Sequence, residues 1–282
     1  MFALGETIEL APDPVLVERA VALFARAIRA AGRTTELRAA ASVVLGCVAV
    51  TRATALAAST EARDRTLLIE TREVMRRQAT NLHARVLDGA RHQWPWPEST
   101  LTPESALIPR ALIIAGMRLN AEVMRTIGVQ VLNWLIDIQT VPAGHLSPVG
   151  SGGWPMGHDR PSFDQLPIDA TSLLLAAEAA YDATGDTRYD LAMERAYDWF
   201  LGANDVGKAV ADPARGACAD ALTATGPDKN RGTEATLMWL MAAEHIRALR
   251  VASPRLVAEV PRGRTLRPGP APSAPSQSAG LI

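Results

Sequence analysis

Gly-Gly-Trp-Pro-Met-Gly-His-Asp-Arg-Pro-Ser-Phe-Asp-Gln-Leu-Pro-Ile-Asp, residues 152–169, is a polar loop rich in Gly and Pro that lies between strongly apolar segments. Residues 202–234 form a second loop of the same character. Loops held by a rigid scaffold commonly carry function. Tryptophan offers a flat apolar face to a sugar ring, and carboxylates and amides match its hydroxyl groups as donors and acceptors. The pattern therefore favours a carbohydrate site at the ends of helices.

The composition of the 282-residue chain favours an all-α fold. Hydrophobic residues make up 48% of it, Ala and Leu are frequent, and β-branched runs are few. Lys plus Arg total 29 against 30 Asp plus Glu, so no net charge attracts nucleic acid or an anionic membrane. We expect neither of them as a partner.

Cysteine usage and the N-terminal residues predict a cytoplasmic protein. Cys47 and Cys218 belong to no Cys-x-x-Cys or Cys/His cluster, so we expect free thiols. Glu6 and Glu9 stand where a signal peptide needs basic residues followed by an apolar run. None of the five histidines pairs with a nearby Cys or His as zinc ligands do, and nucleotide-binding and serine-hydrolase loop motifs are lacking. We expect no metal and no cofactor.

Apolar residues at helical spacing predict eight long helices. The first begins at Asp13-Pro14 and ends at Gly32, because Asp is a good N-cap and Pro fits the first helical position. The others are predicted over about residues 35–56, 61–87, 104–118, 121–140, 167–184, 187–201 and 233–250. We expect one helical domain over residues 1–260 and a disordered Pro/Ser/Ala-rich tail over residues 261–282.

Two helical hairpins repeat a common plan. Residues 115–135 and 183–201 each contain the end of an apolar helix, a short polar turn, and a second helix that ends on Trp and a bulky apolar residue. The endings are Trp134-Leu135 and Trp199-Phe200. Repeated hairpins predict an α/α solenoid or a closed toroid rather than a simple bundle.

Acidic residues in loops and first helical turns are the candidates for catalysis. Cleavage of a glycosidic bond needs one carboxylic acid that protonates the leaving oxygen and a second carboxylate that acts as base or nucleophile. Asp164 is the first choice for general acid or base, and its candidate partners are Asp169, Glu98 and Glu234. Each of these acids could instead cap a helix or interact with its dipole.

Aromatic, amide and further acidic residues of the loops are the candidates for binding the sugar. Trp96 and Trp154 are expected to stack on sugar rings, whereas Trp134, Trp199 and Trp239 lie in helices and are expected to pack in the core. The expected polar contacts come from His145, Gln165, Asn204, Asp205, Asp220 and Asn230. An isomerase or epimerase that uses His145 or His158 as its acid or base stays an alternative.

The order of these loops resembles that of the six-hairpin glycosidase-like (α/α) toroid domains often found C-terminal to bacterial glycosyltransferases. The matching pieces are Trp94-Pro95-Trp96-Pro97-Glu98 and residues 144–150, 153–154, 163–170, 184–186, 199–205, 216–220 and 230–237. The resemblance covers about residues 90–250. The chain departs from the family's pattern at residues 102–105 and at Asp220-Ala221.

This resemblance implies a glycoside hydrolase-like enzyme that acts on an oligosaccharide or glycan. A second hypothesis is a non-catalytic glycan-binding or scaffold module that partners a glycosyltransferase. A complete toroid of this family has twelve helices, so eight imply an open ring or completion by another chain, as in a homo-oligomer.

Overall fold

The computed structural model describes residues 1–91 and 93–252. Residues 1–246 form one compact unit, and a second unit begins at Arg247. The expected tail over residues 261–282, and the expected end of the domain at residue 260, lie outside the described residues.

The described residues are mostly helical, with 62% of them in helix and 7% in strand. This confirms the predicted all-α class. The helices of the described residues are α1 (Phe2–Leu10), α2 (Pro14–Ala31), α3 (Leu37–Arg52), α4 (Thr54–Ala58), α5 (Ala62–Gly89), α6 (Leu107–Arg118), α7 (Glu122–Gln139), α8 (Pro167–Thr184), α9 (Arg188–Phe200) and α10 (Thr233–Ala252). The strands are β1 (Thr100–Leu101), β2 (Trp154–Pro155), β3 (Ala211–Asp212), β4 (Ala217–Cys218), β5 (Leu222–Thr223) and β6 (Gly226–Pro227).

The strands form three small antiparallel pairs in the loops. β1 pairs with β2, β3 with β4 and β5 with β6. The first pair sets Leu101 opposite Trp154 and so fastens the loop before α6 to the loop before α8. A single bridge between Gln165 and Leu222 joins the two long loops that the sequence singled out.

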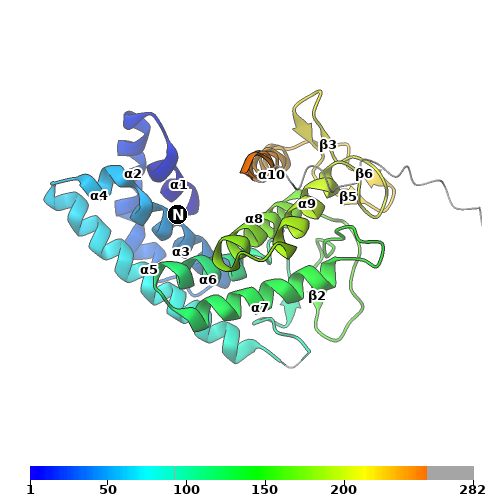
Figure 1. The fold of residues 1–282 in the computed structure, drawn as a ribbon, viewed down its shortest axis with the longest axis horizontal. Helices are drawn as coiled ribbons and strands as arrows, with labels where there is room; N and C mark the ends of the chain where they lie inside the picture. Colours follow the sequence, from blue (N-terminus) through cyan, green and yellow to red (C-terminus); the bar gives the residue numbers. More distant parts are fainter. Residues whose placement is uncertain (92, 253–282) are drawn as a thin grey trace, which may run out of the picture. The chain divides into compact units, whose positions relative to one another are not determined.

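The helices of residues 1–246 pack in two rows (Figure 1). The inner row consists of α3, α6 and α8, in which α6 contacts both neighbours. Of the outer helices, α5 packs mainly on α3, α7 mainly on α6, and α9 on α8. α10 joins α8, where the hydroxyl of Thr171 donates to the carbonyl of Met238 at 2.9 Å. The inner helices are apolar around most of their circumference, as buried helices are.

Local sequence explains where several helices begin and end. Asp13 caps α2 by accepting a hydrogen bond from the amide of Val15 at 2.9 Å, as predicted. Gly185 ends α8 with φ +69°, a left-handed conformation that suits glycine. The predicted start of a helix at Glu104 is wrong, because Glu104 itself has φ +60° and α6 begins at Leu107.

Helix α1 was not predicted, and it packs against α3 through glycine. A Cβ atom at Gly5 would collide with the backbone of Gly46 in the middle of α3, so the two helices touch along their main chains. The short length of α1 and its Gly gave no clear amphipathic pattern. Its position matters because Phe2 and Glu6 form one wall of a cavity described below.

Both cysteines are buried free thiols, which confirms that prediction. Among the helices of residues 1–91 and 93–252, none combines the length and apolar character that a membrane crossing needs.

Replacement of Gly116 in α6 by Ala should lower the free energy of unfolding. A Cβ atom there would lie 2.7 Å from the backbone nitrogen of Arg125 in α7. Helix propensity alone favours Ala by about 1 kcal/mol, but overpacking at this contact costs about 1–3 kcal/mol. Urea denaturation measures the difference. Gly152→Ala is the control, since open space surrounds that position, and equal stability of the two variants would contradict the close helix contact.

Candidate functional site

Acidic side chains gather where α3, α6, α8 and α10 begin, a region called here the acidic end. Glu36 caps α3 by accepting hydrogen bonds from the amides of Arg38 and Ala39 at 3.0 and 2.6 Å. Asp169 lies in the first turn of α8 and Glu234 in the first turn of α10. The helix dipole stabilises negative charge at these positions.

Asp169 is the most deeply buried acid of this region. Its Oδ1 accepts a hydrogen bond from the amide of Glu104 at 2.7 Å, whereas Oδ2 is buried without a partner among the described residues. Burial raises the pKa of Asp169 to about 7, and the hydrogen bond from Glu104 only partly opposes this rise. A carboxyl group with this pKa is present in both protonation states near neutral pH.

Glu104 carries a second carboxyl group with a raised pKa. Burial raises its pKa, the charge of Arg38 opposes the rise, and the negative charge of Glu234 adds to it. The sequence analysis placed Glu104 at the start of a helix and did not select it as a candidate acid. Its backbone conformation instead turns the amide toward Asp169 and leaves the side chain at the edge of a cavity of about 460 Å³.

Arg38 ties the start of α3 to the loop before α6. Its Nε donates to the carbonyl of Pro103 at 3.1 Å, and one of its terminal nitrogens donates to the hydroxyl of Thr102. The same guanidinium forms an ion pair with Glu98 at 3.3 Å, where the Glu98 side chain is 33% exposed. Glu98, a predicted catalytic partner, therefore has a cationic neighbour at the acidic end.

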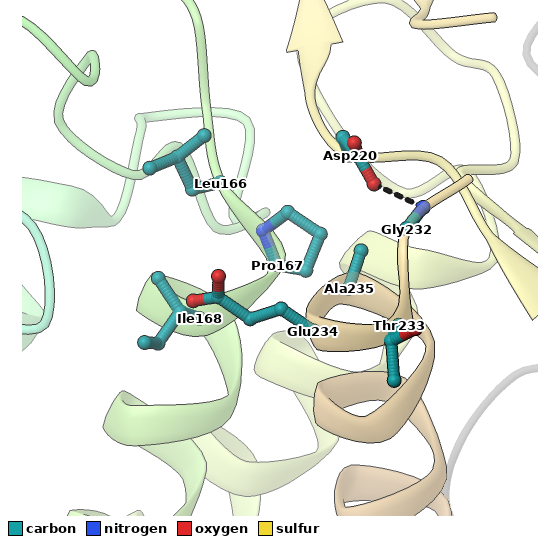
Figure 2. Close-up of a pocket in the computed structure, with 8 residues that line it drawn as sticks. All are labelled: Leu166, Pro167, Ile168, Asp220, Gly232, Thr233, Glu234 and Ala235. Atoms are coloured by element: carbon teal, nitrogen blue, oxygen red, sulfur yellow. Dashed lines mark hydrogen bonds between the residues drawn. The ribbon is translucent and has the colours of Figure 1, made fainter. Parts of the chain in front are cut away.

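A smaller cavity of about 320 Å³ lies between the starts of α8 and α10. Figure 2 shows the carboxylate of Glu234 extending from α10 toward Pro167 and Ile168. Asp220, also on the wall, accepts hydrogen bonds from the amide of Gly232 and from the side chain of Asn230. Asp220 and Asn230, both predicted to bind sugar, thus hold the loop before α10 in place. Glu234 is exposed.

A second polar cluster, around Asp205, joins the connection between α7 and α8 to the loop after α9. Its carboxylate accepts hydrogen bonds from Ser147 at 2.6 Å and Gln165 at 2.5 Å, and one oxygen lies 2.8 Å from Nε2 of His145. The fully buried Gln165 also accepts a hydrogen bond from the indole of Trp199 at 2.8 Å. His145, Gln165 and Asp205 were predicted to bind substrate, and here their polar groups bind one another.

Asn204 closes the loop that follows α9. The side chain is 6% exposed, its amide donates to the carbonyls of Trp199 and Lys208 at 2.8 and 2.9 Å, and its oxygen accepts from the amide of Gly207 at 3.0 Å. These contacts use both the donor and the acceptor of the amide group. Asn204, which was predicted to bind sugar, therefore stabilises its own loop.

The two tryptophans predicted to stack on sugar have different surroundings. Trp96 is 0% exposed and its indole nitrogen has no partner among the described residues, so burial leaves neither ring face open to a ligand. Trp154 is partly exposed and meets Trp94 edge to face at 5.1 Å between ring centroids. Trp134 also meets Trp94 edge to face, at 5.3 Å between ring centroids. The three indoles line an open hollow of about 690 Å³.

Asp164 shares no contact with the acids of the acidic end. It is exposed, and its backbone carbonyl accepts a hydrogen bond from the amide of Ser151 at 2.7 Å. Its carboxylate makes no hydrogen bond or ion pair within residues 1–91 and 93–252. The role of Asp164 as first-choice acid stays a prediction. His158 is also exposed, and its carbonyl accepts from the indole of Trp154 at 2.7 Å.

Three of the four predicted catalytic acids belong to the acidic end. Asp169 accepts a hydrogen bond from the amide of Glu104, Glu98 pairs with Arg38, and Glu234 interacts with Glu104 through its charge. No cluster of three or more His, Cys, Asp or Glu side chains suited to a metal ion occurs in the part of the chain that the structure describes.

Comparison with known proteins gave no match to a family model and no match to a curated protein.

The buried carboxyl of Asp169 should make folding stability depend on pH. Its folded pKa of about 7 lies above the usual 3.8, so its contribution is fully present below about pH 4 and is lost as pH rises through about 7. Asp169→Asn keeps an acceptor for the Glu104 amide but cannot ionise. The variant should therefore gain stability relative to the wild type between pH 4 and 8, by up to roughly 4 kcal/mol. Urea titrations across this range test it, and parallel pH profiles would contradict the assignment.

Asp205 should behave in the opposite way. Burial raises its pKa, but hydrogen bonds from Ser147, His145 and Gln165 outweigh burial and hold the pKa below its usual value. Its contribution is therefore present at neutral pH and is lost as pH falls through the lowered pKa. Asp205→Asn should cost about 1–3 kcal/mol at pH 7, and the difference should shrink below about pH 4.

Thermal and urea unfolding at both pH values measure the effect of Asp205→Asn. The matched control is Asp137→Asn, on an exposed position of α7, which should change little. A loss for Asp205→Asn no larger than that of the control would show that the loop cluster does not depend on this carboxylate.

Proposed function

We propose that the protein is a glycoside hydrolase-like enzyme of the (α/α) toroid class that acts on an oligosaccharide or glycan. The observation that carries this proposal is the charge interaction between Glu104 and Glu234 at the acidic end, where Asp169 accepts a hydrogen bond from the amide of Glu104. Enzymes that cleave glycosidic bonds need two carboxyl groups in different environments, one protonated and one ionised. The resemblance in loop order adds support.

In this mechanism Glu104 is the general acid. Burial and the charge of Glu234 both raise its pKa, which favours the protonated form that donates to the leaving oxygen. Glu234 is exposed beside the 320 Å³ cavity and acts as the second carboxylate, either activating water or attacking the anomeric carbon. Asp169 is a positioning residue, since it holds the amide of Glu104.

The toroid is proposed from the arrangement of the inner row. Charge interactions connect Glu104 with Glu36 before α3 and with Glu234 in α10, so the inner helices start near a common end. The resemblance to glycosidase toroids implies a site at such a common end of the helices. With ten helices in the described residues, we propose an open ring, which a second chain can complete.

A glycan-binding module without catalysis is the second candidate, and the indoles favour it. Trp94, Trp134 and Trp154 surround the open 690 Å³ hollow and offer apolar ring surface to a sugar. The hollow is lined by residues other than the acids of the acidic end, so binding there does not require them.

Glu104→Gln and Glu234→Gln should each lower turnover by about a hundredfold or more, because each removes a proton-transfer or nucleophilic group without changing its size. The assay uses a panel of 4-nitrophenyl glycosides and reducing-end release from unmodified oligosaccharides. Asp164→Asn is the matched comparison and should retain activity. Loss of activity in Asp164→Asn, with both Glu variants active, would transfer the acid role to Asp164.

No turnover on any substrate, together with glycan binding that Trp154→Ala abolishes, would replace the enzyme proposal with the binding-module proposal. Asp169→Asn gives a further check on its positioning role. It should shift the pH profile of kcat while changing KM less than kcat.

A further inference from the structure

A narrow apolar cavity, called here the slot, lies among α1, α6, α8 and α10. Its volume is about 460 Å³, within the range of small-molecule sites. The apolar wall is formed mainly by Phe2, Leu107, Leu175, Met238 and Met241. Methionine side chains adapt to varied apolar ligands.

The slot has a direction set by the helices that line it. The lining side chains pass from Glu104 in the loop before α6 to Leu107 and Arg110 on α6, and on α8 they pass from Ile168 to Leu175. Seven residues of helix span about 10 Å. The slot therefore runs from the acidic end along the inner helices.

Arg110 supplies a positive charge on this apolar wall. Its Nε is buried without a hydrogen-bond partner, and in residues 1–91 and 93–252 its guanidinium makes neither a hydrogen bond nor an ion pair. The guanidinium carbon lies 5.2 Å from the ring centroid of Phe2, which helps to hold it in place. Burial lowers the pKa of Arg110, which reflects the cost of removing this cation from water.

The charges around Arg110 limit what can pair with it. Glu6 and Glu104 also line the slot, and Glu178 pairs with His245 at 2.8 Å. The acids act on Arg110 through space but do not contact it. A single guanidinium matches one carboxylate in a two-pronged geometry, whereas a doubly charged phosphate would meet more repulsion from Glu6.

We propose that the slot binds an amphipathic monocarboxylate, with the carboxylate paired to Arg110 and an unbranched apolar chain along α8 and α10. The ligand's carboxylate pairs with the guanidinium of Arg110, which lines the slot without an ion-pair partner among the described residues, and its chain displaces water from the apolar wall. The evidence for this site, the unpartnered Arg110 and the apolar lining, does not rest on the proposed glycan chemistry.

Calorimetry on the full chain at pH 7.5, with octanoate, 1-octanol, octylammonium and acetate, tests the proposal. Octanoate should bind with one-to-one stoichiometry about ten- to a hundredfold more tightly than 1-octanol, because only octanoate pairs with Arg110. Octylammonium and acetate should bind more weakly still, since one repels Arg110 and the other lacks the apolar chain. Equal binding of octanoate and 1-octanol, or no saturable binding of octanoate, would overturn the proposal.

Two variants locate the binding. Arg110→Gln should bring octanoate affinity down to that of 1-octanol, and Met241→Trp should fill the slot and abolish binding of both. Arg72→Gln, at an exposed arginine of α5, is the matched control and should bind octanoate as the wild type does. Unchanged octanoate affinity in Arg110→Gln would contradict the pairing. If Arg110→Gln does not fold, the four compounds measured on the wild type and on Met241→Trp still test the proposal.

Discussion

One hydrogen bond, from the amide of Glu104 to the buried carboxyl of Asp169, fixes the geometry of the acidic end. It connects the loop before α6 to the first turn of α8, and it needs the left-handed backbone of Glu104. That backbone places the Glu104 side chain at the edge of the slot and within reach of the charge of Glu234. Both the proposed catalytic pair and the cavity beside it therefore depend on this contact.

Asp205 and Asp169 have pKa values shifted in opposite directions because they differ in burial and in the number of donors they meet. Asp205 receives hydrogen bonds from three side chains, which together outweigh its desolvation, and it stays ionised as the centre of a loop cluster. Asp169 receives one hydrogen bond and is more deeply buried, so desolvation wins and its pKa rises. The first arrangement stabilises loops, whereas the second keeps a proton available near neutral pH.

The long helices could be predicted because apolar spacing, N-caps and Gly or Pro at helix ends act locally. The acids in first turns could also be found, since Asp169 and Glu234 follow such helix starts. Spatial partners could not be predicted: Glu104 depends on an unusual φ, and α1 depends on contact between Gly5 and Gly46. Residue type likewise could not reveal that Gln165 bonds to Asp205 in another loop and that Asn204 bonds within its own loop. Nor could it reveal that Trp96 is buried while Trp154 is not.

The position of Glu104 couples the slot to the proposed chemistry. Glu104 borders the slot, and Ile168 lines both the slot and the cavity beside Glu234. An apolar chain in the slot removes water from the Glu104 carboxyl, which favours its protonated form. The positive charge of Arg110 lowers the pKa of Glu104, so a carboxylate that pairs with Arg110 removes this lowering. Both effects raise the pKa of Glu104. Under the two proposals, a molecule in the slot raises the pKa of the proposed acid Glu104 without contacting the sugar.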